Sequence, residues 1–129
     1  MKSDFVLVLT HDHELEKEST IAAAAIGARL LVAQTVSEAL QIVCERGREL
    51  QLVVTDFDNG LRGITLLSAL SMLRKQLPIV AVTSTDRDDA AALAYANGAA
   101  ACLTKPINAA EIEIAIRALS QPKFQLQAA

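Results

Sequence analysis

The chain has 129 residues, of which 52% are hydrophobic and 21% charged, and this is the composition of one folded domain rather than of a disordered segment. The net charge of −3 argues against a broad basic surface, and no apolar run approaches the roughly 20 residues that a membrane span needs. We therefore expect neither nucleic acid nor a membrane to be a direct partner.

The first residues and the two cysteines indicate the cellular compartment. Met1-Lys2-Ser3-Asp4 places an acid where a signal peptide would be apolar, so we expect a cytoplasmic protein. Cys44 and Cys102 lie in unrelated sequence contexts. We expect both thiols to be reduced and buried as small hydrophobic side chains.

Short apolar runs alternate with helical patterns along the chain. The apolar runs are continuous, as in strands that are buried on both faces. Glycines end several helical patterns, and Thr35 with Glu38 has the spacing of a capping box. In chain order, the sequence predicts a strand at 5–9, a helix at 15–26, a strand at 30–32, a helix after Thr35 through Arg46, a strand at 52–54, a helix at 63–76, a strand at 79–82, a helix at 86–97, a strand at 100–103 and a helix that follows Asn108 and ends at Leu119.

Five strands that are each followed by a helix define the fold class. This alternation is typical of an α/β protein in which a parallel sheet carries helices on both faces, a doubly wound (βα)5 arrangement. We expect one domain over residues 1–120 and a polar tail over residues 121–129. Open sheets of this kind carry their working site beyond the carboxyl ends of the strands.

An acid, a hydroxyl and an ammonium group follow three of the predicted strands. Asp56 follows the third strand, Thr83 follows the fourth, and Lys105 follows the fifth. In a sheet of order 2-1-3-4-5, these side chains converge on one pocket beside residues 10–14. A carboxylate can attack phosphorus, and a hydroxyl and an ammonium group can hold the oxygens of the transferred group. The trio therefore indicates a site for a phosphoryl group.

Three motifs make this pattern specific. They are Leu52-Val53-Val54-Thr55-Asp56, Ile79-Val80-Ala81-Val82-Thr83-Ser84 and Leu103-Thr104-Lys105-Pro106. In this order and at these spacings, the chain resembles the receiver domain of response regulators, the CheY-like family. The resemblance covers nearly the whole chain, from about Asp4 to Leu119.

The resemblance implies a flavodoxin-like fold with strand order 2-1-3-4-5 and a role for each site residue. It assigns the phosphoacceptor to Asp56, the switch hydroxyl to Thr83 and the phosphate-binding lysine to Lys105. It also implies Mg²⁺, for which Asp12, Asp56 and the backbone carbonyl of Asp58 are the candidate ligands.

The resemblance further implies a signalling domain rather than an enzyme. A histidine kinase or a phosphotransfer protein would supply the phosphoryl group to a two-component phosphorelay. An output protein or domain would bind the face formed by the fourth helix, the fifth strand and the fifth helix, which also suits a homodimer. The alanine-rich helix with Tyr95 lies on that face, so we expect it to serve as core, as contact surface, or as both.

Four positions depart from the family pattern. Aligning the first apolar run places Thr10 and His11 where the family has its two metal-binding acids, and the distance to Gly27 supports that alignment. A slip of one residue would place Asp12 there, but it needs a compensating deletion in the first helix. Gly60 stands where the family usually has proline, and Cys102 where it has the aromatic switch residue. Mg²⁺ binds weakly without carboxylates, so these departures bear on phosphorylation.

Three hypotheses for function remain at this point. Intact Asp56, Thr83 and Lys105 favour a phosphoacceptor receiver domain. The four departures favour a pseudo-receiver, which uses the same fold to bind partners without phosphorylation. A flavodoxin-like enzyme or nucleotide binder is disfavoured because no glycine-rich loop follows the first strand. We interpret His11 and His13 as part of a solvated loop rather than as a site for Zn, Ni or Cu.

Overall fold

A single parallel sheet forms the centre of the molecule. The computed structural model describes residues 5–57, 61–73, 76–84 and 89–119. The sheet has the order β2-β1-β3-β4-β5, with every neighbouring pair parallel, so β3 is the central strand as predicted. The strands are β1 (Phe5–Leu9), β2 (Arg29–Ala33), β3 (Leu50–Asp56), β4 (Ile79–Thr83) and β5 (Ala101–Thr104).

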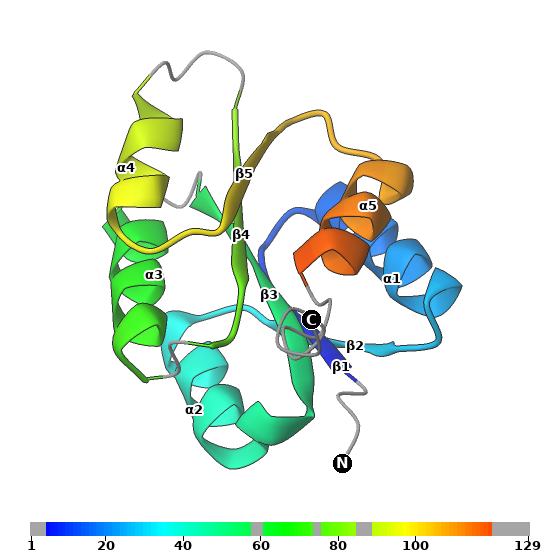
Figure 1. The fold of residues 1–129 in the computed structure, drawn as a ribbon, viewed down its shortest axis with the longest axis horizontal. Helices are drawn as coiled ribbons and strands as arrows, with labels where there is room; N and C mark the ends of the chain where they lie inside the picture. The colour runs from blue at the N-terminus through cyan, green and yellow to red at the C-terminus, as the bar shows by residue number, and fades with distance from the viewer. Residues whose placement is uncertain (1–4, 58–60, 74–75, 85–88, 120–129) are drawn as a thin grey trace, which may run out of the picture.

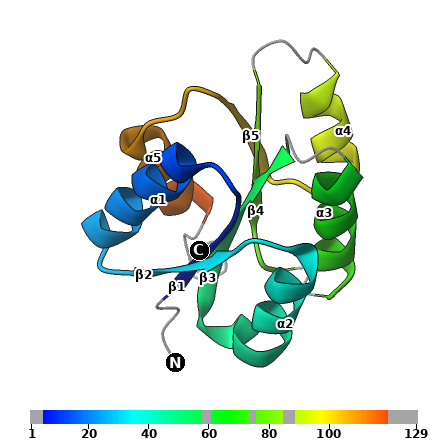
Figure 2. The same cartoon turned by 180° about the vertical axis from the view of Figure 1, so that it is seen from behind.

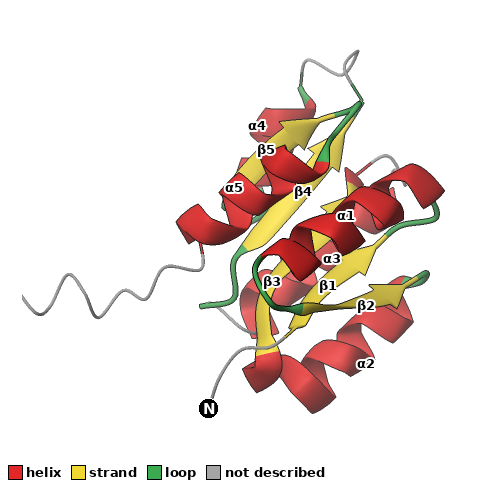
Figure 3. Cartoon of the chain, turned by 90° about the vertical axis from the view of Figure 1, so that its right-hand side faces the viewer, coloured by secondary structure: helices red, strands yellow, loops and turns green. Residues whose placement is uncertain are grey.

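Helices cover both faces of the sheet. The helices are α1 (His13–Ala25), α2 (Val36–Arg46), α3 (Leu61–Leu73), α4 (Ala90–Ala96) and α5 (Ala109–Leu119). Helices α1 and α5 lie side by side on one face, and α2, α3 and α4 lie on the other (Figures 1 and 2). When the molecule is turned by 90°, α1 and α5 lie in front of the sheet (Figure 3). Within the described ranges, no helix has the length and apolarity to cross a membrane.

The two helical layers explain why the strands are apolar at every position. In β1, Val6 and Val8 pack into the cluster under α1 and α5, whereas Leu7 and Leu9 pack into the cluster under α2, α3 and α4. Successive side chains of a strand point to opposite faces, so a strand covered on both faces has no solvent-facing position. The predicted fold class and sheet order are therefore confirmed.

Polar side chains at the helix starts set two of the predicted boundaries. The amide of Glu38 donates to Thr35 Oγ1 at 3.0 Å, which makes Thr35 the N-cap of α2. At the start of α5, Asn108 Oδ1 accepts from the Glu111 amide at 2.9 Å, and Glu111 Oε1 accepts from the Asn108 amide at 3.1 Å. The second pair is a reciprocal capping box at the start of a helix that was predicted to follow Asn108.

Several element boundaries and one cysteine differ from the sequence prediction. Helix α1 begins at His13 rather than at residue 15 because Asp12 caps it. Helix α3 spans Leu61–Leu73, and α4 begins only at Ala90, with residues 86–88 of the predicted helix outside the described residues. The expectation that both cysteines are buried is wrong for Cys44, which is exposed on α2, while Cys102 is partly buried.

The buried hydroxyl of Ser19 gives a prediction for stability. Ser19 on α1 is fully buried, and its Oγ has no hydrogen-bond partner within the part of the chain that the structure describes. Ser19→Ala removes an unsatisfied polar atom and introduces the best helix former, so we expect the free energy of unfolding to rise by about 1 kcal/mol. Urea denaturation measures this change. Val43→Ala, which only removes core volume, is the control and should lower the same quantity.

The two glycines with positive φ give a second prediction. Gly27 has φ 77° and open space around its missing side chain, whereas Gly98 has φ 112° and faces Ser71, whose Oγ a β-carbon at position 98 would strike. Alanine is strained at both positions, but only at position 98 does it also collide.

We therefore expect Gly27→Ala to cost about 1 kcal/mol of unfolding free energy and Gly98→Ala to cost more. Thermal and urea denaturation of the two variants provide the comparison. Equal losses of unfolding free energy in the two variants would show that the collision of a β-carbon at position 98 with Ser71 does not affect stability.

Candidate functional site

Asp56 lies at the carboxyl end of the central strand. The apolar residues of β3 cross the core, and Asp56 is the last residue of the strand, paired in register with Val82 of β4. Only 3% of its surface is exposed. A carboxylate in such a position needs charged or hydrogen-bonding partners, because burial disfavours its ionised form.

The first partner of Asp56 is the hydroxyl of Thr10, which follows β1. Thr10 Oγ1 donates to Asp56 Oδ2 at 2.8 Å and accepts from the backbone amide of Asp12 at 2.9 Å. Thr10 is only 1% exposed. Because the amide must donate, the hydroxyl proton is directed at the carboxylate of Asp56.

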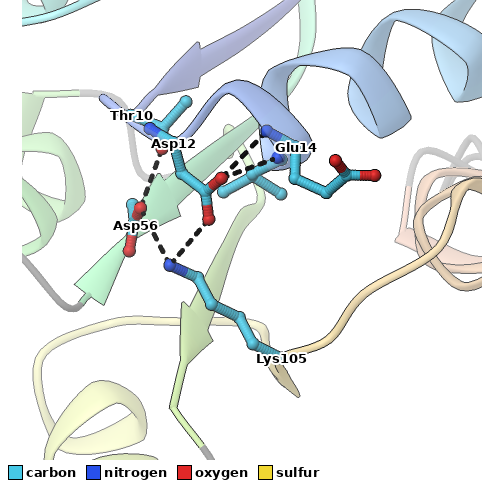
Figure 4. Close-up of polar contacts among 6 residues, drawn as sticks. Thr10, Asp12, Glu14, Asp56 and Lys105 are labelled. Carbon is cyan, nitrogen blue, oxygen red and sulfur yellow. Dashed lines mark hydrogen bonds and ion pairs between the residues drawn. The ribbon is translucent and has the colours of Figure 1, made fainter.

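The second partner is the ammonium group of Lys105, which follows β5. Its Nζ lies 3.2 Å from Asp56 Oδ2 and 3.2 Å from Asp12 Oδ2, so one cation joins two carboxylates (Figure 4). The backbone amide of Lys105 donates to the carbonyl of Thr83 at 2.8 Å, which ties this turn to β4. The ends of β1, β3 and β5 are thereby connected through side chains.

Asp12 has two functions in this cluster. Its Oδ1 caps α1 by accepting from the amides of Glu14 at 2.9 Å and Leu15 at 3.4 Å, while its Oδ2 faces Lys105. Burial by itself would raise the pKa of Asp12. The Lys105 ammonium and the two amides outweigh burial, so the pKa of Asp12 lies below its usual value.

Thr83 and Cys102 form a second contact next to this cluster. Thr83 is buried at the end of β4, and its hydroxyl donates to the carbonyl of Ser84 at 3.2 Å. Burial raises the pKa of the Cys102 thiol, and a hydrogen bond with the Thr83 side chain offsets part of that rise. The Thr83 hydroxyl therefore contacts the backbone and Cys102 rather than a carboxylate.

A hollow of about 360 Å³ lies beside the cluster. Asp12, Ser84, Lys105 and Ile107 are among the residues that line it. The structure thus brings together Thr10, Asp12, Asp56 and Lys105, as the sheet order predicted, and places Ser84 at the rim. The fifth candidate, Asp58, lies outside the described residues.

Comparison with known proteins identifies the family. The response regulator receiver domain family matches residues 6–117. No curated protein matches the sequence at a significant level. Because the family match spans most of the chain, the chain belongs to the response regulator receiver domain family.

Solved structures agree with this assignment. A response regulator receiver domain protein from Clostridium thermocellum is 25% identical, with a TM-score of 0.82, and the match covers 95% of this chain and 98% of that one. NtrX from Brucella abortus is 24% identical with a TM-score of 0.79, and the match covers 99% of this chain but 28% of that one. HP1043, an orphan response regulator of H. pylori, is 15% identical with a TM-score of 0.79, and the match covers 92% of this chain and 98% of that one.

Receiver domains are generally non-enzymatic signalling domains, and they usually bind Mg²⁺. The donor set of the described residues does not fit such an ion. Among the described residues, no three His, Cys, Asp or Glu side chains are grouped as a metal site would require. His11 and His13 are exposed, and the carboxylates of Asp12 and Asp56 both face the Lys105 ammonium. The interpretation of the two histidines as solvated residues agrees with their exposure, but His13 is the first residue of α1 rather than part of a loop.

Two contacts near the site were not predicted from the sequence. Glu18 Oε1 accepts from the amide of Ala109 at 2.8 Å and so joins α1 to the start of α5. Thr10 was recognised only as a missing acid, whereas it is the direct hydrogen-bond donor to Asp56. Both contacts join residues far apart in sequence, so no local pattern encodes them.

The lowered pKa of Asp12 predicts a pH-dependent contribution to stability. A carboxyl whose pKa is lower in the folded than in the unfolded chain stabilises the fold above its unfolded pKa. This contribution is lost as the pH falls through the folded pKa. We expect the wild-type advantage over Asp12→Asn to be constant near neutral pH and to shrink below about pH 4.

Asn also caps helices, so Asp12→Asn changes the charge while keeping the cap of α1. Urea denaturation of both proteins across this pH range measures the difference in free energy of unfolding. A difference that stays the same at acid pH would show that the charge of Asp12 contributes nothing.

Proposed function

We propose that this chain is a cytoplasmic receiver domain of a two-component phosphorelay and that Asp56 accepts the phosphoryl group. The observation that carries the proposal is the position of Asp56, a buried carboxylate at the end of the central strand with the Lys105 ammonium 3.2 Å away. Burial without a compensating cation would disfavour an ionised carboxylate. A negative charge is thus held next to Lys105, which lines the hollow where a phosphoryl group would enter.

The donor in this proposal is a phosphohistidine of a histidine kinase or a phosphotransfer protein. A carboxylate oxygen of Asp56 attacks phosphorus, the phosphorus–nitrogen bond breaks, and its electron pair returns to the imidazole ring. The products are an aspartyl phosphate and a free histidine. The Lys105 ammonium offsets charge on the transferred oxygens, and the Thr83 hydroxyl supplies a hydrogen bond after it leaves the Ser84 carbonyl.

The output of the domain would be a change at the face of α4, β5 and α5. Helix α4 supports this assignment because it has no charged residue. Ala90 and Ala94 pack into the core, whereas Ala91, Ala92 and Tyr95 are exposed. A partner protein or a second copy of the domain would cover these apolar side chains. Phosphorylation would shift the balance between two arrangements of this face.

A second candidate function is that of a pseudo-receiver, which binds partners without phosphorylation. The hydrogen bond from Thr10 to Asp56 favours this alternative, because a neutral hydroxyl stands beside the carboxylate instead of an acid. In that case the cluster of Thr10, Asp12, Asp56 and Lys105 only stabilises the end of the sheet.

Intact mass measurement after incubation with a small-molecule phosphodonor separates the two functions. We expect one phosphoryl adduct on the wild-type protein and none on Asp56→Asn, because only the carboxylate can attack phosphorus. Asp12→Asn is the matched control, since it neutralises a neighbouring carboxylate and leaves the acceptor in place.

Wild-type protein without an adduct, although shown to be folded by circular dichroism, would favour the pseudo-receiver. An adduct that persists in Asp56→Asn would place the acceptor elsewhere and reject the assignment of Asp56.

A further inference from the structure

We infer that this receiver domain has an internal cation in place of a divalent metal ion: the Lys105 ammonium and the Thr10 hydroxyl hold Asp56 so that the site neither needs nor selects Mg²⁺. The inference begins with Asp56 Oδ2, which has the hydroxyl at 2.8 Å and the ammonium at 3.2 Å. Both neighbours are hydrogen-bond donors. The oxygen is therefore stabilised by protons from two other strand ends.

The distance between Thr10 Oγ1 and Asp56 Oδ2 is close to the distance between two oxygens that bind the same Mg²⁺ ion. Mg²⁺ binds oxygens at about 2.0–2.1 Å in an octahedron, so two adjacent ligand oxygens lie about 2.9 Å apart. Thr10 Oγ1 and Asp56 Oδ2 are 2.8 Å apart, but a shared proton joins them. An acid at position 10 would repel Asp56 at this distance unless a cation lay between them. With threonine, the same spacing is stable without any ion.

The charges around the hollow agree with this interpretation. Asp12 and Asp56 contribute two negative charges and Lys105 one positive charge, all within 3.2 Å contacts. Glu14 also lines the hollow, but its carboxylate points away from Asp56 and Lys105 (Figure 4). A divalent cation at Asp56 Oδ2 would have to compete for that oxygen with the Lys105 ammonium and the Thr10 hydroxyl. Its affinity is reduced by the free energy of those contacts.

The position of Asp12 explains why the Lys105 ammonium group suits this site better than Mg²⁺ does. Asp12 Oδ1 is held by the first turn of α1, so the side chain presents only Oδ2 to the hollow. A monodentate oxygen at the rim suits a single ammonium hydrogen. It does not supply the set of oxygens that Mg²⁺ requires.

Titration with Mg²⁺ alone, followed by amide chemical shifts in NMR and by calorimetry at constant ionic strength, tests the inference. We expect wild-type protein to respond no more than Asp56→Asn, because Asp56 binds no ion. Thr10→Asp places a second acid next to Asp56 and should gain saturable binding, with an affinity at least about tenfold higher than wild type. Thr10→Val is the matched control, since it removes the hydroxyl without adding an acid, and it should gain nothing.

Saturable one-to-one binding of Mg²⁺ by wild-type protein that Asp56→Asn abolishes would overturn the inference. The comparison of wild type with Asp56→Asn decides the matter even where Thr10→Asp does not fold. Lys105→Gln provides a second gain of function, because removal of the internal cation leaves two carboxylates for Mg²⁺ and should raise the affinity.

The role of this arrangement in signalling rests on the proposed function, and the two can fail separately. If Asp56 is the acceptor and the site uses its own cation, the yield of the phosphoryl adduct will not change when Mg²⁺ is replaced by a chelator. An adduct that forms only with Mg²⁺ would keep the proposed function and reject the internal cation. Absence of both an adduct and Mg²⁺ binding would keep the internal cation and reject phosphorylation.

Discussion

The ammonium group of Lys105 is the interaction on which the rest of the site depends. It lies 3.2 Å from a carboxylate on the loop after β1 and 3.2 Å from another at the end of β3, while its own backbone is bonded to β4. Four segments of the chain thus meet at one residue. Two carboxylates can stay close together at the edge of a dry core only because this cation lies between them. The ends of β1 and β3 are therefore coupled to the charge of this one side chain.

The fold could be predicted from the sequence because burial on both faces gives a parallel sheet a simple pattern. Runs such as Leu52–Val54 and Ile79–Val82 are apolar at every position, and glycine or a capping pair marks several helix ends. The predictions that were wrong concern the ends of helices and the exposure of one cysteine. Asp12 starts α1 earlier than expected because its side chain caps two amides. Cys44 lies on the outer side of α2, a position that residue type alone does not reveal.

The site was predictable in its members and not in its contacts. Asp56, Thr83 and Lys105 follow strands, so the sheet order alone brings them to one edge. The direction of each hydrogen bond depends on side-chain rotamers and on the backbone of other segments. That is why Thr10 was expected only as a lost acid, although its hydroxyl lies between the Asp12 amide and Asp56. The family assignment places these residues in a signalling domain, and among the described residues no three His, Cys, Asp or Glu side chains form a metal-binding group.

The contact between Glu18 and Ala109 has a mechanical consequence. Glu18 lies in the middle of α1, and the amide that it accepts from is the first of α5, four residues after Lys105 in the sequence. The helix N-terminus attracts a carboxylate by its dipole as well as by the hydrogen bond. This hydrogen bond therefore links α1 and α5, the two helices on this face of the sheet. A displacement of the Lys105 turn would therefore act on the contact between α1 and α5 as well as on the acidic cluster.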